Sequence, residues 1–227
     1  MEVNEQYNVA KPGSLPVRIA AHQRRKMYRE FLAQTGVGVA DTILDVGATG
    51  DRSYDHSNYL EAWYPLKSAI TAVGIDDAAF LETVYPGVRF VRADGRALPF
   101  ADKSFDFVHS SAVLEHVGSS MRQRDFLREA HRVARKGVFL TTPNRWFPVE
   151  FHTVLPLLHW LPAPTFRRCL RAMGRDFFAL EENLNLLTAS GLAGLARAEG
   201  LHGYHVGAVT LCAWPTNLLF VSRLGPA

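Results

Sequence analysis

Three acidic residues in the first half of the chain stand at or near the ends of strand-like hydrophobic runs. Asp45 lies near the end of the run 42–46, Asp76 follows the run 70–75, and Asp94 follows the run 88–93. Ligands of open α/β sheets bind outside the carboxyl ends of the strands, where a glycine turn lets backbone approach them closely. We therefore expect the three carboxylates to converge on one pocket, for a ligand that carries amine, ribose hydroxyl and adenine donors.

Strand-like and helix-like segments alternate along the chain, which predicts an α/β fold with a mostly parallel sheet wound on both faces. Strands are expected at residues 42–46, 70–75, 88–93, 105–110, 137–142, 202–209 and 217–223, and helices at 17–34, 58–64, 78–85, 120–135 and 186–199. Gly36 should end the first helix, and a short loop containing Pro215 should join the last two strands.

Length and composition suit one globular domain, with 227 residues of which 48% are hydrophobic and 21% charged. The net charge of +3 and the scattered arginines argue against an obligate nucleic-acid binder. Cys169 and Cys212 are far apart and lack a CxxC partner, so neither a metal site nor a disulfide is expected. The chain has no secretion signal and no apolar run of membrane-spanning length, which predicts a cytoplasmic protein.

Four motifs follow one another in order between residues 40 and 143. They are Asp45-x-Gly47-x-x-Gly50, Asp76, Asp94-Gly95-x-x-Leu98-Pro99-Phe100 and Ser104-Phe105-Asp106-x-Val108. This series resembles the class I S-adenosylmethionine (SAM)-dependent methyltransferases. Leu98-Pro99-Phe100 and Leu114-Glu115-His116-Val117 are most similar to the type-11 methyltransferase-domain group within them. The resemblance implies a doubly wound, seven-stranded Rossmann-like sheet, mostly parallel, with an antiparallel last strand.

By the same resemblance the cofactor is SAM, held at the strand ends. Asp45 and Gly47 would face its methionine part, with Gly47 and Gly50 shaping the turn. Asp76 would accept from the ribose hydroxyls, and Asp94 from the adenine amino group beside the backbone of Gly95.

Two further residues complete the predicted cofactor site. Thr49 and Asp51 stand where the family commonly has glycines, so Thr49 or Asp51 is expected to contact the methionine end directly. Ser110, at the end of the fourth expected strand, is the other predicted cofactor contact.

The alternation of strands and helices is interrupted between residues 145 and 185. This segment is expected to form a lid over the strand ends, within a single methyltransferase domain of residues 1–227. Its apolar side chains either pack as a satellite core or line a cavity for a small acceptor: Trp146, Phe147, Phe151, Leu155, Leu157, Leu158, Trp160, Leu161 and Phe166. Either a substrate anion or solvent would face the arginines that follow: Arg167, Arg168, Arg171 and Arg175.

Methyl transfer from a sulfonium is an in-line displacement, so the protein mainly aligns donor and acceptor and excludes water. A hydroxyl acceptor also needs a general base, for which His116, His152 and Glu115 are the candidates. The alternative is that both histidines are structural. We expect methylation of a small molecule at oxygen, and favour sugars, lipid-linked or specialised metabolites.

Two other functions stay open, a non-catalytic SAM-binding scaffold or regulator and an RNA methyltransferase with a basic face. A nicotinamide-binding domain is excluded because Gly47 and Gly50 do not match the GxGxxG spacing and Asp76 lies too far downstream. An amino-methylating nucleic-acid enzyme is excluded because no Asn/Asp-Pro-Pro-aromatic element follows the fourth expected strand. The oligomeric state is not determined by these patterns.

Overall fold

The seven expected strands form one sheet in the order β3-β2-β1-β4-β5-β7-β6 in the computed structural model, which describes residues 14–52 and 57–225. Among these strands β7 alone runs antiparallel to its neighbours β5 and β6, as the resemblance implies. The predicted fold class is therefore confirmed. The strands are β1 (Ile43–Val46), β2 (Ile70–Gly74), β3 (Arg89–Arg92), β4 (Phe105–Ser111), β5 (Ala134–Pro143), β6 (Tyr204–Leu211) and β7 (Trp214–Arg223).

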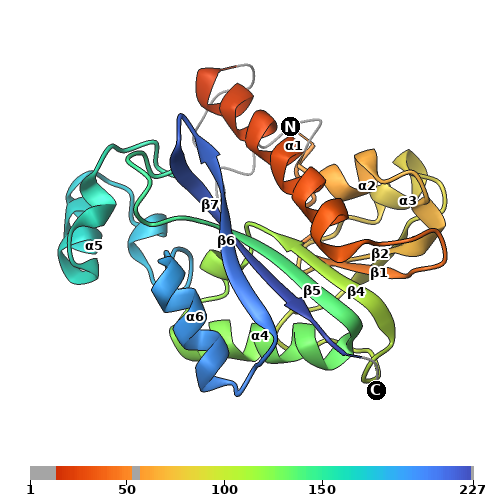
Figure 1. Cartoon of the computed structure of the whole chain (residues 1–227). Helices are drawn as coiled ribbons and strands as arrows, with labels where there is room; N and C mark the ends of the chain where they lie inside the picture. Colours follow the sequence, from red (N-terminus) through yellow and green to blue (C-terminus); the bar gives the residue numbers. More distant parts are fainter. Residues whose placement is uncertain (1–13, 53–56, 226–227) are drawn as a thin grey trace.

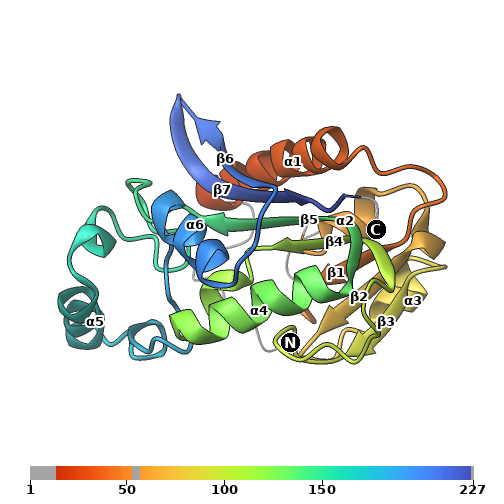
Figure 2. The same cartoon turned by 60° about the horizontal axis from the view of Figure 1, so that its bottom comes forward.

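Helices cover both faces of the sheet, and Figure 2 shows α1 on one side of it and α4 on the other. Neighbouring residues of a strand point to opposite faces of the sheet. Ile43 of β1 therefore packs in the core beneath α1, α2 and α3, and Leu44 packs in the core beneath α4 and α6. None of the described helices is long and apolar enough to cross a lipid bilayer. The helices are α1 (Leu15–Thr35), α2 (Tyr59–Trp63), α3 (Phe80–Val84), α4 (Ser120–Val133), α5 (Ala163–Ala172) and α6 (Ala189–Ala198).

Two of the differences from the expected element boundaries have a clear structural cause. Helix α4 ends at Val133 and β5 begins at Ala134, because the next two side chains pair with Asp106 of β4. Arg135 Nη1 lies 3.1 Å and Lys136 Nζ 3.3 Å from Asp106 Oδ1, which holds this backbone extended. The hairpin turn between β6 and β7 falls at residues 212–213, both with positive φ, so Pro215 lies inside β7 instead of in the loop.

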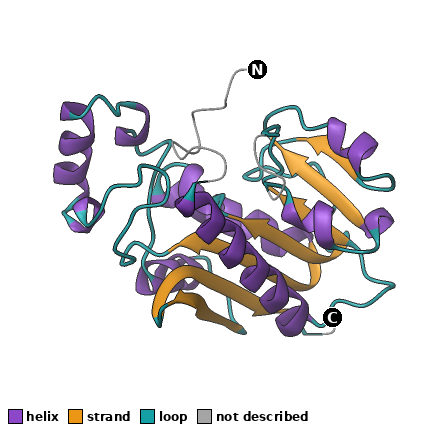
Figure 3. Cartoon of the chain, turned by 90° about the horizontal axis from the view of Figure 1, so that it is seen from above, coloured by secondary structure: helices purple, strands orange, loops and turns teal. Residues whose placement is uncertain are grey.

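The lid segment leaves the sheet after β5 and returns at α6. It carries α5 and the 3₁₀ turns η3 (Leu158–Trp160) and η4 (Phe177–Ala179). Figures 1 and 3 show α5 standing to one side, away from the layers that cover the sheet. A small core of its own, separate from the two cores of the sheet, holds the segment together: Phe166, Leu170, Phe178, Ala179 and Leu184.

Candidate active site

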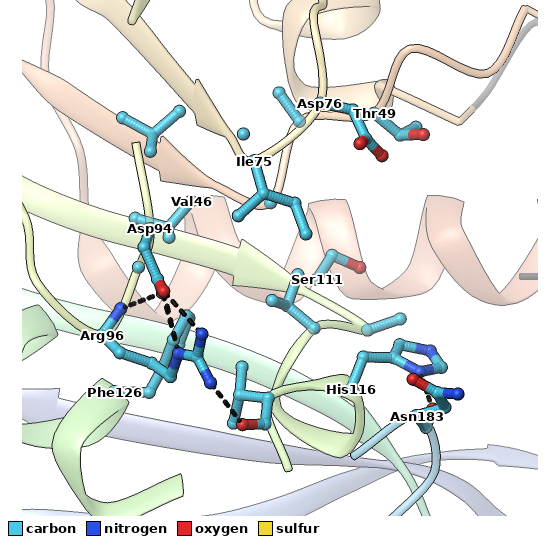
Figure 4. A pocket seen from close by; sticks show the side chains of 18 of the residues that line it. Val46, Thr49, Ile75, Asp76, Asp94, Arg96, Ser111, His116, Phe126 and Asn183 are labelled. Atoms are coloured by element: carbon cyan, nitrogen blue, oxygen red, sulfur yellow. Dashed lines mark hydrogen bonds and ion pairs between the residues drawn. The ribbon is translucent and has the colours of Figure 1, made fainter. Parts of the chain in front are cut away.

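A cavity of about 420 Å³ opens at the carboxyl ends of β1, β2, β3 and β4 and is closed on one side by the lid. Figure 4 shows its walls, with Asp94 and Arg96 on one side and His116 and Asn183 on the other. Its volume falls within the roughly 300–1,000 Å³ of small-ligand pockets. Seven of the predicted site residues line it: Gly47, Thr49, Asp76, Asp94, Gly95, His116 and His152.

The turn after β1 forms one wall, and its path depends on Gly47. That residue has φ of +114°, and a Cβ there would lie 2.0 Å from a methyl carbon of Val113. The amides of Gly47 and Ala48 both donate to the carbonyl of Val73, which ties the turn to β2. The Thr49 hydroxyl accepts from the amide of Asp51 at 3.1 Å, so side-chain hydrogen bonding stabilises the turn where the family commonly has glycines.

Two other predicted glycines have separate roles. A Cβ on Gly95 would lie 2.5 Å from the ring of Phe126 and 2.8 Å from Val46, so glycine is needed for α4 to approach the floor of the cavity. Gly50 does not line the cavity, because it faces the backbone of Asp77, whose carbonyl oxygen would lie 2.9 Å from a Cβ. Gly50 therefore shapes the turn without contacting the ligand space.

Of the three predicted acids, Asp76 has the fewest hydrogen-bond partners among the described residues. It follows β2, is half-buried and lines the cavity, and none of the described residues donates a hydrogen bond to its carboxylate. The neighbouring Ile75 also lines the cavity with 58% of its surface exposed. This corner thus combines available acceptor oxygens with an apolar face.

Asp94 also lines the cavity but is paired with Arg96, a residue that the sequence did not single out. Arg96 Nη2 lies 2.6 Å from Asp94 Oδ2, and the Arg96 amide donates to Asp94 Oδ1 at 2.9 Å. Hydrogen bonding from the Arg96 side chain lowers the pKa of Asp94, which is therefore ionised at neutral pH. Arg96 Nη1 donates to the carbonyl of Val117, which fixes the pair against the wall.

Asp45 does not line the cavity, and the expected meeting of three acids is wrong in this respect. Side chains along a strand alternate between the two faces of the sheet, so Asp45 points to the face covered by α1 and α2. On that face it lies beside His109, the residue that pairs with it on β4. There His109 Nδ1 bonds the Asp45 carboxylate, and His109 Nε2 pairs with the hydroxyl of Tyr59 at 2.9 Å. Burial raises the pKa of Asp45 to about 7 and lowers that of His109 to about 4.

The same alternation corrects a second prediction, because Ser110 is buried in the sheet and the next residue, Ser111, lines the cavity. Glu115 is likewise buried behind the cavity wall. The alternation of side chains along β4 predicts that Ser111 faces the cavity, once the last residue of that strand is known. Arg96 had no signal in the sequence, apart from its position two residues after Asp94.

Glu115, His116 and His152, the three predicted catalytic residues, do come together. His116 Nε2 lies 3.0 Å from His152 Nε2, and Glu115 Oε1 lies 3.9 Å from each of these nitrogens. The first two belong to η2 (Leu114–His116), which follows β4, and His152 belongs to the lid. We call these three residues the Glu115–His116–His152 cluster.

Neighbours fix the orientation of both imidazoles and of Glu115. His116 Nδ1 lies 2.6 Å from the carbonyl oxygen of Asn183, and His152 Nδ1 lies 2.6 Å from Glu150 Oε1. Thr142 donates to Glu115 Oε2 at 2.9 Å.

Burial and neighbouring charge then shift the pKa values in this region. Burial raises the pKa of Glu115 to about 7, and burial together with the charge of His152 lowers that of His116 to about 3. Burial opposes ionisation of Glu150 as well, yet the charge and hydrogen bonds of His152 hold its pKa at about 2.

The lid contributes different residues from those expected. Phe177 and Asn183 line the cavity with His152, whereas none of the predicted aromatic and leucine side chains of residues 146–166 does. The lid arginines are also outside it, and the cationic lining comes from Arg24, Arg96 and Arg122. Leu155, Leu158 and Phe166 pack in the lid's own core, because the segment must bury apolar surface to hold its shape. Leu157 and Leu161 are exposed.

A mostly parallel sheet in the order 3-2-1-4-5-7-6, with an acid-lined cavity at its carboxyl edge, defines the class I methyltransferase fold. Residues 44–142 match the sequence family described as "methyltransferase domain". The chain is also similar over 98% of its length to the crystal structure of a Pyrococcus horikoshii protein, with a TM-score of 0.59, 15% identity and 97% of that chain covered.

Two curated relatives share part of the sequence. A ubiquinone/menaquinone biosynthesis C-methyltransferase from Xylella fastidiosa is 32% identical over 159 residues, which are 63% of this chain and 60% of that protein. An uncharacterized methyltransferase from Mycolicibacterium gilvum is 39% identical over 106 residues, 46% of this chain and 40% of that protein. The chain thus spans no more than about three fifths of either relative. Residues 44–142 thus carry a methyltransferase domain, as the motifs predicted.

Proposed function

We propose that the protein transfers a methyl group from SAM to an oxygen atom of a small molecule. The observation that carries this proposal is the cavity with two chemically different sides, at the carboxyl edge of a class I sheet. Asp76, Ile75 and Asp94 offer acceptors and an apolar face that suit an adenosyl group. The Glu115–His116–His152 cluster borders another part, where an acceptor hydroxyl can lose its proton.

Within this proposal the turn at Gly47 and Thr49 receives the methionine part of SAM. The ionised Asp94 retains acceptor capacity beyond its bonds to Arg96, because a carboxylate offers about four lone-pair sites. The lid, through His152, Phe177 and Asn183, closes the acceptor side and excludes water from the reaction. The protein's part in the chemistry is then alignment, desolvation and removal of one proton.

An acceptor of limited size is favoured because the cavity of about 420 Å³ must hold it together with SAM. A lipid-linked, sugar or specialised metabolite presenting a hydroxyl fits this description. The resemblance to a C-methyltransferase over 159 residues favours one alternative, transfer to a carbon atom activated by a neighbouring hydroxyl. Both reactions use an acceptor oxygen that loses its proton, and they differ in the atom that receives the methyl group.

Calorimetric titration with SAM and with S-adenosylhomocysteine tests the cofactor assignment. Incubation with methyl-labelled SAM and metabolite extracts, followed by NMR of the labelled product, then identifies the acceptor and separates O-methyl from C-methyl groups. An enzyme consumes SAM when an acceptor is present, whereas a scaffold binds SAM without consuming it. Labelling of RNA instead of small molecules would contradict the proposed acceptor class, and the cytoplasmic location stays a prediction.

A further inference from the structure

The three converging atoms of the Glu115–His116–His152 cluster have the spacing of metal ligands. The two imidazole Nε2 atoms are 3.0 Å apart, and Glu115 Oε1 is 3.9 Å from both. A triangle with these sides has one point that lies about 2.1 Å from all three atoms, which matches the roughly 2.0–2.2 Å of zinc bonds to histidine nitrogen and carboxylate oxygen. Figure 4 shows His116 of this cluster at the wall of the cavity.

Proton positions make the arrangement unusual for a purely structural cluster. The partner of His116 Nδ1 is a carbonyl oxygen, which can only accept, so the proton of this imidazole sits on Nδ1. His152 Nδ1 faces a Glu150 carboxylate that already accepts from the amides of His152 and Thr153, so this nitrogen is a donor as well. In their neutral forms both histidines therefore direct Nε2 lone pairs toward each other.

Glu115 supplies an independent observation. Its side chain is fully buried, and Oε1, the atom facing the two histidines, has no hydrogen-bond donor among the described residues. A buried carboxylate oxygen without a partner costs several kcal/mol in apolar surroundings unless a proton or a cation compensates it. With both imidazoles neutral, three electron-pair donors thus converge on one point.

We propose that Glu115, His116 and His152 bind one divalent transition-metal ion, of the class represented by Zn²⁺, at the acceptor side of the cavity. Two imidazoles and one carboxylate suit Zn²⁺, Fe²⁺ or Co²⁺ and disfavour Mg²⁺ and Ca²⁺, which prefer all-oxygen ligands. Three protein ligands leave at least one coordination position for water or substrate, as in catalytic zinc sites.

Residues around the cluster have the arrangement expected of a second coordination shell. Glu150 orients His152 through Nδ1, the Asn183 carbonyl orients His116 in the same way, and Thr142 holds the other oxygen of Glu115. The ligands come from η2 and from the lid, so the ion would also tie the lid to the sheet. The expectation that the chain has no metal site rested on the spacing of its cysteines, and the Glu115–His116–His152 cluster contains no cysteine.

The role of the ion rests on the proposed function. A metal ion supplies Lewis-acid chemistry, which lowers the pKa of a bound hydroxyl and so favours its deprotonation near neutral pH. In that case His116 and His152 act by positioning the ion, and the acceptor hydroxyl sits at its open position. The site itself does not depend on which acceptor is used.

Binding of Zn²⁺ and Co²⁺ to chelator-treated protein tests the site directly. Calorimetry should give one equivalent of Zn²⁺, and one equivalent of Co²⁺ should produce visible absorption bands that Zn²⁺ removes. Glu115→Gln and His152→Ala should weaken the affinity most, and Glu150→Gln, which removes a carboxylate bonded to His152 alone among the three ligands, should weaken it by roughly 10–100-fold. His205→Ala, at an exposed histidine on β6, should leave it unchanged.

Three results would overturn the site: no stoichiometric binding to the wild-type protein, equal affinity in the Glu115→Gln variant, or equal loss in His205→Ala. Such results would mean that a proton shared between His116 and His152 occupies this point instead. SAM affinity separates the two proposals, because metal-stripped protein should still bind SAM with unchanged affinity while methyl transfer falls and returns with Zn²⁺. If the metal-loaded protein does not bind SAM, the proposed function is refuted and the metal site is not.

Discussion

Replacing Asp76 with alanine tests how the cavity holds the ribose of SAM. The carboxylate lines the cavity, is half-buried, and accepts no hydrogen bond from the described residues, so its lone pairs are available to a ligand. Hydrogen bonds to a charged group contribute a net of about 1.5–3 kcal/mol. Asp76→Ala should therefore raise the Kd of SAM roughly 10–150-fold.

The neighbouring Asp77 provides a matched control. It is exposed, lies outside the cavity and accepts from the amide of Ala79 at 2.9 Å, just before α3. Asp77→Ala should lower the free energy of unfolding by about 0.5–1.5 kcal/mol, the net value of that hydrogen bond. SAM affinity should stay at the wild-type level.

The two variants should thus show opposite patterns in two assays, calorimetric titration with SAM and urea unfolding. Asp76→Ala should change the free energy of unfolding by no more than about 0.5 kcal/mol, since its carboxylate has no described partner to lose. Equal SAM affinities in Asp76→Ala and Asp77→Ala would show that Asp76 does not contact the cofactor, and the proposed ribose site would be wrong.

Three further outcomes are expected. Gly47→Ala should cost about 2–5 kcal/mol in urea unfolding, because positive φ and the contact with Val113 both oppose a Cβ, whereas Gly194→Ala in α6 should be neutral or stabilising by up to about 1 kcal/mol. The pKa of Asp45 in the folded protein is about 7, above the ordinary 3.8, so folding opposes ionisation of this acid and its contribution to the stability of the wild type falls as pH rises from 4 to 7. Asp45→Asn has no such ionisation and should therefore gain stability relative to the wild type over that range. Parallel curves of unfolding free energy against pH for the two proteins would contradict this assignment. Phe177→Ala should raise the KM for the acceptor and leave SAM affinity unchanged, because Phe177 lines the cavity. The control Leu180→Ala, at an exposed lid residue, should change neither the KM nor the SAM affinity. A change in SAM affinity alone would place Phe177 on the cofactor side.

Local patterns determined the elements of the sheet and most of the cofactor edge. Alternating apolar runs and helix signals fix strands and helices because hydrophobic periodicity and capping act over a few residues. Gly36 ends α1 with φ of +65°, as expected for a helix stop. The acids at 76 and 94 reach the same cavity because parallel strands present their carboxyl ends to one edge.

The direction of individual side chains was decided by tertiary structure. Asp45 stands in the best-matched motif, yet strand alternation and the register with His109 turn it away from the cavity. Arg96 pairs with Asp94 through a geometry that depends on the loop after β3, and no periodic pattern encodes it. A one-residue difference in strand parity likewise replaces Ser110 with Ser111.

By itself the sequence predicted the methyltransferase domain, the sheet and the three residues proposed for acid–base chemistry, since each depends on local order along the chain. Only the fold decided that those three residues meet, because Glu115 and His116 follow β4 whereas His152 arrives from a lid 36 residues later. Packing of that lid around its own small core sets the 3.0 Å between the two imidazoles. Contacts between distant segments are fixed by long-range packing, which local periodicity does not record.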